Sequence, residues 1–217
     1  MVQVTALFDK LALTAHLQDL DIEAIGDGEV MKGVSPSLFA RVIEKIPTVN
    51  VASALVTKCQ ILELLKALDN DSSLSNLNIS SNTNLAWIRP RLISSFAKLR
   101  KLNLSGCQLS GGQINILFGS ISEAGCMREL DISYNNLSKI SPRVLRSILW
   151  PGLTSLNLSF SWLSLQQIQS FLTSVSSRGS VRRVRTYLDI RQNFQSIQIE
   201  NIKLQAQALN LLYLIKI

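Results

Sequence analysis

The chain has 217 residues, a formal net charge of +7 and a hydrophobic content of 47%. This much apolar material excludes a disordered chain and is enough for one folded domain or a continuous array of repeats. No apolar run reaches the roughly 20 residues that span a bilayer, so we expect no membrane span. The amino-terminal stretch 1–22 has no basic region and carries Asp9 and Lys10 inside its apolar part, which excludes a secretory signal.

Catalytic and metal-binding chemistry has little support in the residue content. The cysteines Cys59, Cys107 and Cys126 are odd in number and lack CxxC spacing, which favours a reducing compartment, the cytoplasm or the nucleus. The only histidine, His16, lies far along the chain from Cys107, so no nucleophile–base pair and no zinc ligand set is predicted. We therefore expect a protein that is not an enzyme and needs neither a metal nor a cofactor.

One motif recurs along the chain and decides the fold class. It reads L-x-x-L-x-(L/I)-x-x-(N/C/S)-x-L, and its copies begin 25 to 29 residues apart. Such near-regular repetition predicts a solenoid, in which each unit stacks on the one before it. Looser copies begin at Leu17 and Ile46, and clear copies begin at Leu74, Leu99, Met127 and Leu153.

The segments between the motifs have helical spacing of their apolar residues. Each unit is therefore predicted to be a short strand, a turn and a helix. Parallel strands sit about 4.8 Å apart while helices need about 10 Å, so stacked units must splay their helices outward. We predict an α/β horseshoe of about seven repeats, with parallel strands on the concave face and helices on the convex face. The helical segments are 37–46, 59–68, 112–121, 141–149 and 164–175.

The motif resembles the leucine-rich repeat, and the repeat length with a helix in each unit is similar to the ribonuclease-inhibitor-like subclass. Residues 17–193 carry the resemblance, and we treat the whole of 1–217 as one such domain. The resemblance implies a module that binds protein partners and does no catalysis.

The carboxy-terminal units leave two questions open. A seventh copy fits either a start at Val181 or a register shifted by four residues, in which Leu188 and Ile190 face inward; we favour the shifted register. After residue 193 the phase is lost, although 199–209 imitates the motif again. Residues 194–217 are either an irregular cap or the end of an array cut short, and we favour the second.

Alternate residues of a strand point to opposite faces, which defines a candidate binding surface. The fourth and sixth motif positions point into the core, and the third, fifth and seventh point to the concave surface. This surface either meets a protein partner or is simply a solvated polar face, and its charge is predicted to run from acidic at the first repeat to basic at the last. The predicted partner-binding residues are Asp19, Asp21, Glu23, Asn76, Asn78, Lys101, Asn103, Ser105, Glu129, Asp131, Asn157, Asp189 and Arg191.

Three residues outside the strands are also conspicuous. Cys107 occupies the ninth motif position, where other copies have asparagine, and is expected to be a buried structural thiol. Tyr134 and Trp162 follow their strands and either form exposed contacts for a partner or pack against a neighbouring turn.

Two alternative functions remain open. The arginines between 178 and 191 could contact the phosphates of a nucleic acid or another polyanion. A GTPase-regulating scaffold is a weaker alternative, because the first arginine, Arg41, lies in a helix expected on the convex side. The sequence leaves the oligomeric state open. The proposed polyanion contacts are Arg178, Arg182, Arg183 and Arg185, beside Arg191.

Overall fold

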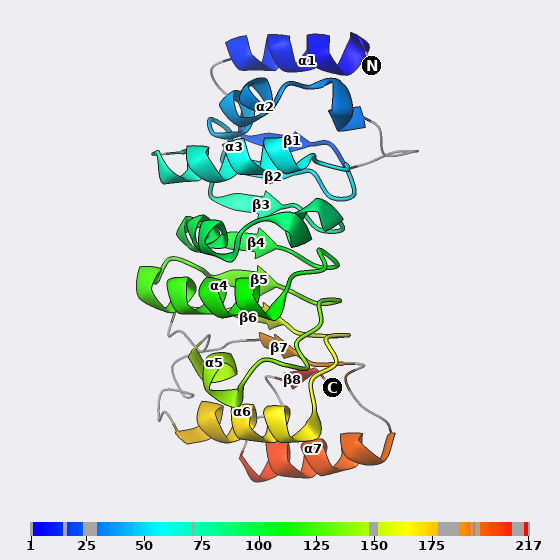
Figure 1. Cartoon of the computed structure of the whole chain (residues 1–217). Helices are drawn as coiled ribbons and strands as arrows, with labels where there is room; N and C mark the ends of the chain where they lie inside the picture. Colours follow the sequence, from blue (N-terminus) through cyan, green and yellow to red (C-terminus); the bar gives the residue numbers. More distant parts are fainter. Residues whose placement is uncertain are drawn as a thin grey trace.

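The protein is described by a computed structural model that covers residues 2–14, 17–23, 30–70, 72–147, 152–177, 187–191, 193, 196–209 and 215–216. In these residues one eight-stranded parallel sheet runs in the order of the sequence, each strand beside the next (Figure 1). This arrangement confirms the predicted α/β solenoid. The strands are β1 (Asp19–Asp21), β2 (Thr48–Asn50), β3 (Asn76–Asn78), β4 (Lys101–Asn103), β5 (Glu129–Asp131), β6 (Ser155–Asn157), β7 (Tyr187–Asp189) and β8 (Ile215–Lys216).

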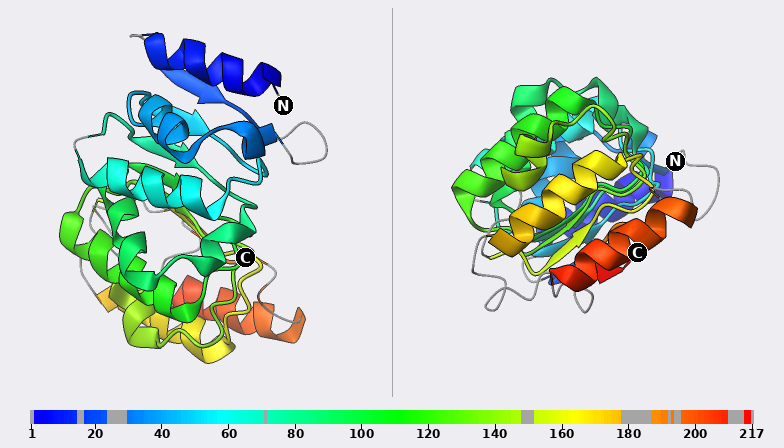
Figure 2. Two further views of the ribbon diagram at one scale, coloured as in Figure 1. Left: turned by 45° about the horizontal axis from the view of Figure 1, so that its top comes forward. Right: turned by 90° about the horizontal axis from the view of Figure 1, so that it is seen from below.

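Helices alternate with the strands and line one side of the sheet (Figure 1). Viewed along the stack, the strands superpose as one layer (Figure 2, right). Every helical segment predicted from the sequence contains a helix, although the helix within 37–46 already ends at Ile43. The helices are α1 (Val2–Leu13), α2 (Pro36–Ile43), α3 (Lys58–Asp69), α4 (Gly111–Ala124), α5 (Pro142–Ser147), α6 (Leu165–Ser177) and α7 (Ser196–Ala208), with 3-10 segments η1 (Val30–Gly33), η2 (Thr83–Trp87) and η3 (Pro90–Lys98).

The third repeat differs from the others because its helical part is of the 3-10 kind, η2 and η3. The unit that starts at Leu74 is the shortest, with 25 residues before the next copy. A 3-10 helix rises about 2.0 Å per residue against about 1.5 Å for an α-helix, so fewer residues cover the same length. The short unit therefore still spans the stack.

Strand register follows the fourth motif position through the array. Leu77 pairs with Leu102, and Leu102 pairs with Leu130. At the seventh copy Leu156 pairs with Leu188, and Leu188 and Ile190 are buried, which confirms the shifted register. The inward residues of successive units join into one continuous apolar core. The core side of the sheet is therefore closed, and the opposite side carries the polar strand residues.

A helix lies at each end of the array, α1 at the first repeat and α7 at the last (Figure 1). Helix α1 packs on α2, where the rings of Phe8 and Phe39 stack with centroids 6.2 Å apart, so α1 covers the first repeat. At the other end, most of the motif-like segment 199–209 lies in α7, with Ile202 and Ala206 buried. An L-x-x-L spacing suits a helix face as well as a strand and turn, which explains why this helical segment imitates the motif. Strand β8 then pairs with β7 and continues the array.

Candidate functional site

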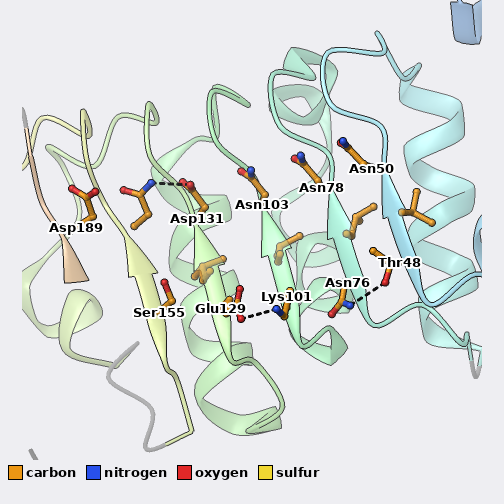
Figure 3. A pocket seen from close by; sticks show the side chains of 15 residues that line it. Thr48, Asn50, Asn76, Asn78, Lys101, Asn103, Glu129, Asp131, Ser155 and Asp189 are labelled. Carbon is orange, nitrogen blue, oxygen red and sulfur yellow. Dashed lines mark hydrogen bonds and ion pairs between the residues drawn. The ribbon is translucent and has the colours of Figure 1, made fainter. Parts of the chain in front are cut away.

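A groove of about 470 Å³ runs across the concave face of the sheet. Its walls are strand residues from β2 to β7, and most of the lining residues have polar side chains (Figure 3). The groove is therefore built from the third and fifth motif positions of successive units. The polar lining comprises Thr48, Asn50, Asn76, Asn78, Lys101, Asn103, Glu129, Asp131, Ser155, Asn157 and Asp189.

The fifth-position residues form one row and share a local bond. In each, the side-chain oxygen accepts a hydrogen bond from the backbone N–H two residues later, at 2.9–3.2 Å, which ends the strand in a tight turn. The preference for Asn or Asp at this position is thus partly structural, because these side chains close such a turn well, while Ser and Thr close it more weakly. The row comprises Asp21, Asn50, Asn78, Asn103, Asp131, Asn157 and Asp189.

This turn decides which atoms of the row remain available. Because a backbone N–H needs an acceptor, the amide oxygen of each asparagine faces the turn and its NH₂ group faces away. The Nδ2 of Asn157 donates to Asp131 Oδ2 at 2.8 Å. Within the described residues, the Nδ2 groups of Asn50, Asn78 and Asn103 have no partner, and they lie side by side along the groove (Figure 3). The groove therefore presents three neighbouring hydrogen-bond donors.

The third-position residues form a second row nearer the strand starts (Figure 3). Asn76 donates to the hydroxyl of Thr48 at 3.1 Å, and Lys101 pairs with Glu129 at 2.7 Å. Both charged side chains are about half exposed, at 53% and 46%. An exposed ion pair of this kind is worth about 0–1 kcal/mol, so a partner can displace it at little cost.

Three lining residues were not predicted from the sequence: Thr48, Asn50 and Ser155. The signal was present, since the looser copy from Ile46 puts Thr48 and Asn50 in the third and fifth positions, and the copy from Leu153 puts Ser155 in the third. Every other lining residue with a polar side chain was predicted. At the first strand, Asp19, Asp21 and Glu23 are exposed beside the groove, as their motif positions require. Ser105 is half-buried and shares a hydrogen bond with Ser133 at 2.9 Å.

The basic end of the predicted charge order is only partly visible. Arg191 Nε and Nη2 donate to the two carboxylate oxygens of Asp189, at 3.0 and 2.8 Å, so this arginine is engaged within its own turn. The other arginines of the predicted polyanion contact lie outside the described residues, and that function stays a prediction; they are Arg178, Arg182, Arg183 and Arg185. Arg41 lies in α2, on the helical side as expected.

Carboxamide side chains join each repeat to the one before it and hold the groove's scaffold together. At the junctions into repeats three and five, Asn82 and Asn135 each donate to a carbonyl of the preceding repeat, Val51 and Leu104, and accept a backbone N–H from it. Asn193 does the same at the junction into repeat seven. Both Asn82 and Asn135 are 1% exposed, so these bonds replace water for buried backbone groups.

The remaining junctions use glutamine instead. The side chains of Gln60, Gln113 and Gln167 accept the N–H of the helix N-cap residue at 2.7–2.8 Å. Their Nε2 groups also donate to carbonyls of the preceding repeat, at 2.6–3.3 Å. Asparagine and glutamine thus alternate as the buried link at the junctions between β1 and β7. At the junction into repeat three, the Nδ2 of Asn84 adds a further bond to the Val56 carbonyl at 3.0 Å.

This alternation explains Cys107. Its repeat is joined to the preceding one by Gln113, so the ninth position there needs no amide, and Ala54 and Ser161 fill the same position in the other glutamine repeats. The Cys107 thiol is fully buried and donates to the Ile79 carbonyl at 3.3 Å. Burial raises the pKa of this thiol from 9.0 to about 12. These observations support a structural thiol.

Thiol reactivity at pH 8 is expected to separate the three cysteines of the native protein. Cys59 and Cys126 are exposed and should react with a disulfide reagent, while Cys107 should react only after unfolding. Because burial raises its folded pKa above 9.0, the stabilisation from the neutral Cys107 thiol is complete below pH 9 and declines as the pH rises toward 12. Quantitative thiol titration with and without denaturant measures this, and rapid native reaction at all three sites would contradict it.

Aromatic side chains mark one rim of the groove-bearing sheet. Tyr134 and Phe160 occupy equivalent turns of neighbouring repeats and stack with ring centroids 4.4 Å apart, so Tyr134 both packs on its neighbour and stays 56% exposed. Trp162 is 64% exposed. All three have left-handed backbone with φ of 53° to 56°, which is uncommon for bulky residues.

Two further observations concern the described part of the chain. No three side chains of the metal-ligating kinds come together there. No helix in the same residues combines the length and the apolar character that crossing a membrane would demand.

Comparison with known proteins agrees with this architecture. A family model described as Leucine Rich Repeat matches residues 98–120 and 126–148. A Tonsoku-like protein of Danio rerio is 31% identical over 150 residues, which are 63% of this chain and 10% of that protein, so the chain spans about a tenth of the relative's length.

A solved structure gives the same result for the fold. The leucine-rich repeat-containing protein LegL7 from Legionella pneumophila superposes with a TM-score of 0.53 at 16% identity, over 93% of this chain and 77% of that one. The tropomodulin C-terminal domain of Caenorhabditis elegans gives 0.41 at 15% identity, over 83% and 97%. Proteins of this repeat class typically mediate protein–protein interaction and are typically not enzymes. The repeated motif, the sheet register and these matches together identify the chain as a leucine-rich-repeat protein.

Proposed function

We propose that this chain is a non-catalytic binding module that holds a protein partner in its concave groove. The observation that carries the proposal is the row of Nδ2 groups of Asn50, Asn78 and Asn103, which have no partner within the described residues and face the groove. Polar groups that already bond to one another gain little from a ligand. These three donors, in contrast, are available to bond to a ligand.

The shape of the groove favours a polypeptide over a compact small molecule. Its two rows of polar groups run parallel, the row at the fifth motif position across six strands and the row at the third position across five. A polypeptide also offers regularly spaced hydrogen-bonding groups, and concave solenoid surfaces are extended binding surfaces. The exposed rings of Tyr134 and Trp162 at the rim supply the aromatic contacts that often carry much of the affinity of protein interfaces.

A photo-crosslinking experiment tests the location of the partner. We place a benzophenone amino acid at Ser155, which lines the groove and whose side chain has no hydrogen-bond partner in the described part of the chain. A matched protein carries the same group at Asn115, which is exposed on α4 on the opposite side. After irradiation in an extract of the source cells, we expect a discrete protein adduct from position 155 that is missing from position 115.

Two outcomes would count against the groove. One is the absence of any protein adduct from position 155, and the other is the same set of adducts from both positions. The three-position charge reversal of Lys101, Glu129 and Asp131 is a second test, since a partner held in the groove should no longer be retained by that variant.

A further inference from the structure

We infer that the partner's segment is basic and extended, and that it lies on the concave face across strands β1 to β5, from the exposed first strand into the groove. This inference rests on the proposed function and adds the chemistry of the partner. It is carried by three observations. The charge on this face is negative, its unpaired hydrogen-bonding groups are donors, and its two acidic ends lie a defined distance apart.

The charge on the concave face is opposite in sign to the charge of the whole chain. At the outward strand positions, six carboxylates stand against three cations, which leaves an excess of three negative charges on a chain of net charge +7. The basic excess of the protein therefore lies elsewhere, and a basic segment is repelled by most of the surface but attracted to this face. The charged groups are Asp19, Asp21, Glu23, Glu129, Asp131 and Asp189, with Lys101, Arg191 and Lys216.

The free donors in the middle of the face suit the main chain of an extended segment. Asn50, Asn78 and Asn103 stand on three neighbouring strands, so their Nδ2 groups cover about 10 Å at the usual strand spacing of about 4.8 Å. Backbone carbonyls are acceptors that every polypeptide has, and these amides bind them without selecting a side chain. An acidic partner would also satisfy the donors, but it would meet Asp21 on one side and Asp131 on the other.

The two acidic ends set the spacing of basic side chains in the partner. Asp21 on β1 and Asp131 on β5 are four strand spacings apart, or about 19 Å. An extended chain covers this distance in about six residues at about 3.3 Å each. Basic residues about six positions apart therefore reach both ends while the main chain between them contacts the asparagine row.

Existing contacts leave both ends able to take a cation. Asp19, Asp21 and Glu23 are exposed, and no salt bridge to them is present within the described residues. At the other end Glu129 is held only by the half-exposed Lys101, and Asp131 accepts bonds from the neutral donors of Ser133 and Asn157. Neutral donors leave the negative charge of a carboxylate in place.

Fluorescence anisotropy with two labelled octapeptides tests the inference on the intact chain. The first peptide, KKGSGSKK, has basic pairs six residues apart, and the second, EEGSGSEE, is its acidic counterpart. We expect saturable binding of the basic peptide that weakens with salt, and no binding of the acidic peptide. Asp21→Asn keeps the turn bond to Glu23 but removes the charge, and should weaken binding about threefold.

A second variant separates hydrogen bonding from general electrostatic attraction. Asn78→Ser keeps a side-chain acceptor for the Ser80 N–H but removes the free NH₂, and should weaken binding about threefold to tenfold. Glu123→Gln removes a charge from the exposed end of α4 and should leave binding unchanged. Equal weakening by Glu123→Gln and Asp21→Asn, or full affinity in Asn78→Ser, would overturn the inference.

The outcome is distinguishable from failure of the proposed function. If neither peptide binds, or the acidic peptide binds more tightly, while position 155 still crosslinks to a protein, then the groove holds a partner of other chemistry and the inference of a basic segment is wrong. If crosslinking from position 155 also fails, the proposed function falls with it.

Discussion

Replacement of Asn135 by alanine is expected to lower the free energy of unfolding by about 3 kcal/mol, because it strips partners from several buried backbone groups at once. The Nδ2 of Asn135 donates to the carbonyls of Leu104, Ile132 and Ser133 at 2.8–3.1 Å. Its Oδ1 accepts the Leu109 N–H at 2.9 Å. Alanine supplies none of these bonds.

Urea unfolding followed by circular dichroism measures this loss, with Asn136→Ala as the matched control. Asn136 is the next residue along the chain and is exposed, and its side chain accepts only local bonds from Ser138. We expect the control to cost less than about 1 kcal/mol. Equal losses in the two variants would mean that the junction bonds of Asn135 contribute nothing special to the stack.

Replacement of Gln113 by alanine is expected to have a similar effect, about 3 kcal/mol, at the preceding junction. Its side chain is fully buried, accepts the N–H of Ser110 at 2.8 Å and donates to the carbonyls of Leu85 and Ile88 at 2.8 Å each. The substitution thus removes the helix cap and also leaves two carbonyls of the third repeat without their hydrogen-bond donor.

Asn115→Ala is the control for this second variant, because it changes an exposed residue on the same helix α4. Alanine has the higher helix propensity, so the control should leave stability unchanged or raise it slightly. Differential scanning calorimetry of both variants gives the comparison. A melting temperature of Gln113→Ala that equals that of Asn115→Ala would refute the role assigned to the glutamine.

The sequence predicted the fold and most of the groove because one signal, the repeated leucine spacing, fixes both the strand phase and the outward positions. Leu77, Leu102 and Leu130 mark the phase, and the residues on either side of each of them line the groove. Ambiguity arose only where the spacing fits two structures. The segment 199–209 reads as a motif but forms a helix, since the same leucine intervals describe one helix face.

Other features depend on atoms that a residue pattern does not distinguish. The motif gives Asn50 and Asn157 the same position. Only the structure shows that the Nδ2 of Asn157 donates to Asp131, while the Nδ2 of Asn50 has no partner among the residues that the structure describes. The glutamine links had a readable signal in the capping-box pattern S/T-x-x-Q at 57–60, 110–113 and 164–167. That pattern predicts a helix start, and it carries no information about the preceding repeat whose carbonyls the glutamine reaches.

The alternation of asparagine and glutamine links has a consequence for how such an array can grow or shrink. Removal of a two-repeat block such as residues 74–126 would bring Asn135 against the second repeat, which already gives an N–H and a carbonyl to Asn82 in the intact chain. Removal of one repeat, residues 99–126, would instead place Asn135 and its unit on the third repeat. The carbonyls of that repeat that accept bonds from Gln113 in the intact chain would then lose their donor. The interchangeable building block of this solenoid is therefore a pair of repeats, and its length can change without mismatch only in even steps.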